Sequence, residues 1–116
     1  MTIIIDFKLS NWNETINTNR RNRYLGATLK KKEMSIIKMF LIGKPKITKY
    51  PIKLNCKWYT KNLSSDLDNK SLKSVLDAMQ EVGILENDNC KHIIEINHKV
   101  IKSNKDYLEL DIEEVE

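Results

Sequence analysis

Three aspartates and a lysine in the second half of the chain have the types and the spacing that chemistry on a phosphate group requires. Asp66 and Asp68 stand two residues apart, Lys73 follows them, and Asp88 comes after a Gly-bounded turn. Carboxylates are the ligands that hard cations such as Mg²⁺ prefer, with water and phosphate oxygens completing the shell. A bound Mg²⁺ ionises a water molecule, and a nearby ammonium group stabilises charge that develops on the phosphate. The pattern therefore suggests metal-dependent chemistry on a phosphate ester.

A helix is expected between the first two acids and the third, so the fold decides whether they meet. Residues 69–82 carry an apolar stripe at helical spacing, and a helix of about 14 residues spans roughly 21 Å. Asp88 reaches the other acids only if the segment 83–88 runs back along the helix, or if the acids converge across a dimer interface. The spacing leaves both arrangements open.

The same residues also have ordinary structural explanations. Asp66 and Asp68 suit the N-terminus of a helix, where a carboxylate caps free N–H groups and interacts with the macrodipole. Asp88 suits a polar turn, and Lys73 suits a solvated helix face. An Asp-x-Asp-Asn motif by itself does not distinguish capping from metal binding.

The two halves of the chain carry opposite charge. Residues 1–62 hold 14 Lys and Arg against 3 acids, a formal charge of +11, whereas residues 63–116 hold 6 Lys against 13 acids, a formal charge of −7. A basic segment of this kind favours a polyanion such as DNA as partner, although charge runs are also common on solvated faces. The expected DNA contacts are Arg20, Arg21, Arg23, Lys30, Lys31, Lys32 and Lys70.

The length of 116 residues suits one domain that spans 1–116, and a domain this small gains stability by forming a homodimer. Cys56 and Cys90 belong to no Cys-x-x-Cys pair and have no His at metal-ligand spacing, so we expect reduced thiols rather than zinc ligands. The N-terminal apolar run is too short to target or span a membrane. These features predict a cytoplasmic protein that uses neither a membrane nor a small-molecule cofactor.

The hydrophobic pattern predicts an α/β fold with the element order β-α-β-α-β-β. The expected strands are 2–9, 51–60, 91–101 and 106–114, and the expected helices are 22–43 and 69–82. The strand 51–60 alternates strictly, with an apolar face and an opposite face that carries Lys53, Lys57 and Tyr59. The last two strands are expected to form a hairpin. Together, these elements predict a small mixed sheet of about four strands packed against two main helices.

The segment 64–89 resembles the RusA family of Holliday junction resolvases, which are often encoded by phages and prophages. The matching residues are the "DLDN" of 66–69, Lys73, the triplet "DAM" of 77–79, Gly83 and Asp88. The likeness extends more loosely over about four-fifths of the chain. It implies a homodimeric endonuclease, dependent on Mg²⁺ with Mn²⁺ as a substitute, that nicks two strands of a four-way DNA junction in a bacterial cell. By the resemblance, Asp66, Asp68 and Asp88 are the catalytic acids and metal ligands, and Lys73 is the catalytic lysine.

Two departures from the family pattern keep alternatives open. The interval between "DLDN" and "DAM" is one residue longer than in the family's best-known member, so Lys70 competes with Lys73 for the role of catalytic lysine. The run of arginines that precedes the acids in that member is replaced here by "NLSS". The alternatives are a nuclease of broader specificity that also cleaves DNA flaps and replication forks, and a basic DNA-binding accessory protein without catalytic activity.

Overall fold

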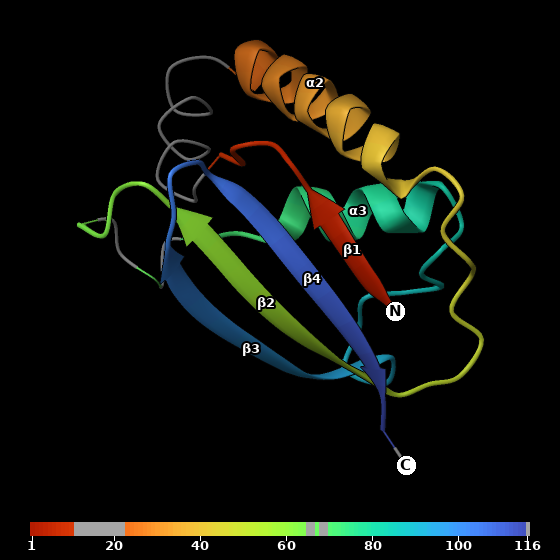
Figure 1. Ribbon diagram of the computed structural model, residues 1–116. Helices are drawn as coiled ribbons and strands as arrows, with labels where there is room; N and C mark the ends of the chain where they lie inside the picture. Colours follow the sequence, from red (N-terminus) through yellow and green to blue (C-terminus); the bar gives the residue numbers. More distant parts are fainter. Residues whose placement is uncertain (11–22, 65–66, 68–69, 116) are drawn as a thin grey trace.

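A computed structural model describes residues 1–10, 23–64, 67 and 70–115 of the chain. In this part the elements are β1 (Thr2–Ile5), α2 (Arg23–Leu41), β2 (Ile52–Thr60), α3 (Lys73–Glu81), β3 (Ile93–Lys102) and β4 (Tyr107–Glu114). Both helices lie on the same face of a four-stranded sheet, as Figure 1 shows. Both contribute side chains to one hydrophobic cluster. The predicted α/β class and the predicted order of elements are confirmed.

The sheet has the strand order β1-β4-β2-β3, which makes β2 and β4 the central strands. β2 pairs in parallel with β3, and α3 lies on the connection between them. A parallel pair requires such a crossover, because a tight turn can only reverse the chain. β4 pairs antiparallel with β2 on one side and with β1 on the other. The sheet is therefore mixed, as predicted.

The expected hairpin between the last two strands is wrong, because β2 lies between β3 and β4. The four-residue connection crosses the end of β2 and is fastened to it. The N–H of Ser103 donates to the carbonyl of Thr60 at 2.9 Å, and the N–H of Lys61 donates to Asp106 at 3.2 Å. Burial explains the choice of position: Leu108, Leu110 and Ile112 of β4 need cover from the helices, whereas β3 leaves apolar side chains exposed at the sheet edge.

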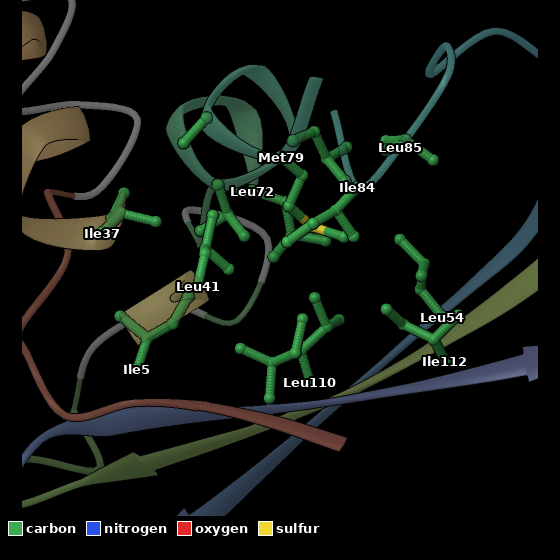
Figure 2. Packing of buried hydrophobic residues seen from close by; sticks show 14 of the residues in the cluster. Ile5, Ile37, Leu41, Leu54, Leu72, Met79, Ile84, Leu85, Leu110 and Ile112 are labelled. Carbon is green, nitrogen blue, oxygen red and sulfur yellow. The ribbon is translucent and has the colours of Figure 1, made fainter. Parts of the chain in front are cut away.

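The hydrophobic core lies between the helices and the inner face of the sheet. The predicted alternation of β2 is confirmed, since Ile52, Leu54, Cys56 and Trp58 are all buried. Figure 2 shows Leu54, Leu110 and Ile112 pointing from the strands toward Leu72, Met79 and Ile84. Burial raises the pKa of the Cys56 thiol to about 12, whereas Cys90 is exposed.

The outer face of β2 is not the basic surface that its sequence suggests. The ammonium group of Lys53 lies 3.3 Å from Glu95 on β3 and 3.7 Å from Glu113 on β4, and Lys57 lies 3.5 Å from Glu109. The hydrogen bond and the charge of Glu95 raise the pKa of Lys53. The neighbouring strands therefore neutralise the lysines of β2 on this face.

The helix α3 begins four residues later than its sequence pattern predicts. Its N-cap is Leu72, which offers no side-chain capping bond, so neither Asp66 nor Asp68 occupies the capping position. The helix ends at Glu81 with Val82 as its C-cap, and Gly83 follows with a φ of +82°, which suits a residue without a Cβ. Strand β1 also ends early, at Ile5 rather than at residue 9. Neither described helix is long and apolar enough to cross a membrane.

Two neighbouring isoleucines of β1 test the assignment of the core face. Ile5 is fully buried, whereas Ile4 points to the outer face and is 49% exposed. We expect Ile5→Ala to lower the free energy of unfolding by about 2–5 kcal/mol, because it leaves a cavity under the helices. The matched control Ile4→Ala should cost about 1 kcal/mol or less. Urea denaturation followed by circular dichroism measures both, and equal losses would contradict the assignment.

Candidate functional site

A cleft of about 420 Å³ opens where β2 ends, β4 begins and the chain leaves β1. Its size lies in the range of ligand-binding pockets. Three lysines reach it from separate segments: Lys8 after β1, Lys61 after β2, and Lys70 before α3. None of them forms an ion pair within 4 Å with a residue that the structure describes, although Lys8 and Lys61 lie close enough to Asp106 to interact with its charge.

Aromatic side chains form part of the wall of this cleft. Trp58 is held in place by the core and by its indole N–H, which donates to Nδ1 of His98 at 2.9 Å. Burial lowers the pKa of His98 and so favours the neutral imidazole that accepts this bond. The ammonium of Lys70 lies 5.9 Å from the centre of the Trp58 ring, a cation–π distance. Tyr59 and Tyr107 stack with ring centres 4.2 Å apart.

Asp106 fixes the connection between β3 and β4 at the cleft. Desolvation alone would raise the pKa of its carboxyl. The bonds from the Lys61 N–H and the Thr60 hydroxyl, with the charges of Lys8 and Lys61, outweigh this effect and lower the pKa. Asp106 therefore stays ionised and helps to hold two of the cleft lysines near each other.

A buried carboxylate anchors another wall of the cleft. Glu33 on α2 is only 6% exposed and accepts a hydrogen bond from the N–H of Ser10 at 2.8 Å. This bond fastens the segment that follows β1, which carries Lys8, to the helix layer. No sequence pattern indicates this role, because Glu33 follows three lysines and is 23 residues from its partner.

Asp66 and Asp68 lie outside the described residues, but their described neighbours are at the cleft. Lys61 and Asn62 line it as the chain leaves β2, and Lys70 and Ser71 line it as the chain approaches α3. The N–H of Lys70 donates to the carbonyl of Leu67 at 3.1 Å. Described residues on both sides of the two acids therefore line the cleft.

Asp88 lies at the opposite end of β2. It is exposed in the turn between Glu86, whose N–H donates to the hydroxyl of Tyr50 at 3.0 Å, and His92, whose carbonyl accepts from Ile52 at 2.8 Å. β2 has 9 residues, which corresponds to about 30 Å of strand. The segment 83–88 therefore continues away from the start of α3 instead of running back along the helix. The path of the described segment therefore does not fit the return along the helix, and convergence across a dimer stays a prediction.

The described residues do not by themselves form a magnesium site. Among them, no three His, Cys, Asp or Glu side chains converge in a way that could hold a metal ion. Of the three predicted acids, Asp88 is the one among the described residues, and it lies on an exposed turn. A metal site that includes the sequence-predicted acids would depend on Asp66 and Asp68.

The predicted basic contacts fall in different environments. Lys70 lines the cleft, whereas Lys73 is the exposed first residue of α3. Lys30 forms an ion pair of 2.7 Å with Asp77, so the "DAM" aspartate links the two helices. Lys31 and Lys32 are exposed on α2. Arg20 and Arg21 lie outside the described residues, and Arg23 is the first residue of α2, with a side chain that is not described.

No model of a known protein family matches the chain, and no curated protein matches it. The resemblance to the RusA family therefore rests on the motif residues between 64 and 89.

The carboxylate of Asp106 allows a test of the cleft's internal structure by pH. A lowered pKa in the folded state contributes stability above the ordinary aspartate pKa of about 3.9, and this contribution is lost as the pH falls through the folded-state pKa. We expect Asp106→Asn to unfold at lower urea concentration than the unmodified protein at pH 7. The difference should shrink progressively at acid pH. The control Asp88→Asn removes an exposed turn carboxylate and should change stability less; a pH-independent loss for Asp106→Asn would contradict the assignment.

Proposed function

We propose that the protein is a Mg²⁺-dependent, structure-selective endodeoxyribonuclease that resolves four-way DNA junctions by paired symmetric nicks. The observation that carries the proposal is the cleft at the end of β2, because it combines three lysines with aromatic rings and adjoins the segment of the "DLDN" motif. The resemblance to RusA resolvases supplies the reaction and the substrate. The process served is recombination and repair, or phage DNA processing, in the cytoplasm of a bacterial cell.

The cleft suits the backbone of DNA better than a neutral ligand. Lysine contacts to phosphates supply most of the affinity of sequence-independent binding and make it dependent on salt. Such contacts position the nucleic acid without reading its sequence. Lys8, Lys61 and Lys70 would hold phosphates, and the exposed parts of Tyr59 and Tyr107 would offer a surface against which an unpaired base at a junction stacks.

The positions of the motif aspartates lead us to propose that the active protein is a homodimer. Asp88 and the cleft, which the described neighbours of the Asp66 and Asp68 segment line, stand at opposite ends of β2. In a two-fold dimer, the turn of one copy can approach the cleft of the other. Two equivalent sites would then face a four-armed substrate that has two-fold symmetry of its own.

Cleavage of an end-labelled four-way junction tests the function directly. We expect paired nicks in Mg²⁺, none in EDTA, and no cleavage of linear duplex. Asp66→Asn should reduce the rate at least about 100-fold and retain binding, because it removes a metal ligand without adding bulk. The matched control Asp111→Asn changes an aspartate on β4, away from the cleft and the motif, and should remain active.

Other outcomes separate the alternatives. Equal rates on flaps, forks and junctions would favour a nuclease of broader specificity. Salt-dependent binding of DNA with no nick in Mg²⁺ or Mn²⁺ would favour a DNA-binding accessory protein. Full activity of the Asp66→Asn variant would contradict the proposal that Asp66 is a metal ligand.

The cleft geometry favours Lys70 over Lys73 as the lysine that acts on the phosphate. Lys70 lines the cleft beside Trp58, whereas Lys73 points from an exposed helix start. We expect Lys70→Ala to slow junction cleavage by about 100-fold and Lys73→Ala by less than about tenfold. Single-turnover rates at saturating protein separate chemistry from binding. The reverse order would assign the role to Lys73, as the family resemblance implies.

A further inference from the structure

The buried indole of Trp58 depends on an exposed histidine for its hydrogen bond. Trp58 is 6% exposed, and its indole N–H donates to Nδ1 of His98 at 2.9 Å. The centres of the two rings lie 6.0 Å apart, with an angle of 21° between the ring planes. His98 stands on the edge strand β3, where solvent reaches it. Because a buried N–H without an acceptor costs free energy, this bond helps to fix the position of the indole.

The bond requires one protonation state of His98. An indole N–H can only donate, so Nδ1 of His98 accepts and carries no proton, which places the ring proton on Nε2. In the imidazolium both ring nitrogens are donors. Protonation of His98 therefore replaces the hydrogen bond with two N–H groups that point at each other.

The surroundings of His98 favour its neutral form. β3 packs mainly against β2, where Cys56 lies opposite His98 as a neutral thiol, because burial raises its pKa to about 12. The ammonium of Lys70 approaches from the segment before α3, over the indole ring. Lys57 and Lys99 lie on the opposite face of the sheet. No acid among the described residues forms an ion pair with His98, and burial lowers its pKa.

We propose that neutral His98 is a pH-sensitive latch that holds Trp58, and with it one wall of the cleft, in place. Trp58 lines the cleft, and the ammonium of Lys70 lies 5.9 Å from the centre of its ring. His98 is not among the described residues that line the cleft, so it is a positioning residue that acts through Trp58.

Protonation of His98 affects the cleft in two ways. Trp58 loses the acceptor that fixes its indole, and the imidazolium becomes a second cation beside the ring that Lys70 faces. Both changes weaken the cation–π contact of Lys70. A ligand that uses the lysine and the ring together therefore binds less tightly at acid pH. The latch itself rests on contacts within one chain, and its effect on nucleic acid rests on the proposed function.

NMR spectroscopy follows the latch directly, because the chain has two histidines and two tryptophans. His92→Asn leaves His98 as the titrating imidazole, and Trp12→Phe leaves Trp58 as the indole. We expect the indole N–H resonance of Trp58 to shift as His98 takes up its proton, at a pH below the ordinary histidine pKa of about 6.5. His98→Asn offers a side-chain oxygen near the position of Nδ1 and does not titrate. In that variant the indole resonance should stay constant over the same range.

The reciprocal variant Trp58→Phe deletes the donor and keeps an aromatic ring. We expect it to raise the pKa of His98, because the neutral imidazole no longer accepts a hydrogen bond that stabilises it. The matched control Tyr107→Phe removes a polar group from another aromatic ring of the cleft and should leave the pKa of His98 unchanged. The titration of the His98 ring protons measures both variants.

Binding of a single-stranded oligothymidylate connects the latch to the cleft. Its affinity is measured by fluorescence anisotropy at about pH 7.5 and at about pH 5.5, the range in which histidine changes its charge, at constant salt. Phosphodiesters and lysines keep their charge over this range. We expect the affinity of the unmodified protein to fall about threefold or more at acid pH, relative to His98→Asn.

Several outcomes would overturn the inference. They are an indole resonance that does not follow the protonation of His98, an equal shift in His98→Asn, an unchanged pKa of His98 in Trp58→Phe, and a pH effect on oligonucleotide affinity that is the same with and without His98. Circular dichroism establishes that each variant is folded at both pH values. An oligonucleotide that binds at neither pH would contradict the proposed function, and the NMR titration would still decide whether the latch exists.

Discussion

The structure depends on β2 having a partner on each side. Its parallel pairing with β3 requires the crossover that contains α3. Its antiparallel pairing with β4 places β4 beneath the helices. The alternation of β2 then sets the inner face of the sheet, where its four apolar side chains meet those of both helices. The same strand also separates two features of the proposed site, because the lysine cleft lies at one end of β2 and the Asp88 turn lies at the other.

Ion pairs explain what becomes of the charge asymmetry between the two halves of the chain. Lysines of the basic half pair with acids of the acidic half along β2 and between the two helices, as in Lys57–Glu109, Lys30–Asp77 and Lys38–Glu81. Much of the excess charge is therefore satisfied inside the molecule, at exposed or half-exposed positions where each pair contributes little to stability. The lysines of the cleft are different, because no acid of the described chain lies within ion-pair distance of them.

Local pattern was sufficient to predict the order of elements and most of the core. Strict alternation identified β2. The predicted stripe of the second helix is buried at Leu72, Val75, Leu76 and Met79, whereas its last member, Val82, follows the helix and is 45% exposed. The pairing of β3 and β4 was not predictable in this way, because a short polar connection looks the same whether it joins neighbours or crosses a strand end. The cleft was also hidden, since Lys8, Trp58 and Asp106 come from segments that only the folded sheet brings together. The acids were visible in the sequence, but their relation depends on a second chain or on residues outside the described part.

The pairing of β1 with β4 joins segments from opposite ends of the sequence. Thr2 lies opposite Asp111, and the amino group of Met1 donates to the carbonyl of Ile112, a separation of 111 residues. During synthesis, β1 leaves the ribosome before β4, the described strand with which it pairs, and residues 6–106 lie between them. Because β4 also separates β1 from β2, the sheet cannot assemble in stages from its first strand. The isoleucines of β1 therefore stay without their native strand partner until β4 is made, which makes this pairing a non-local and late step of folding.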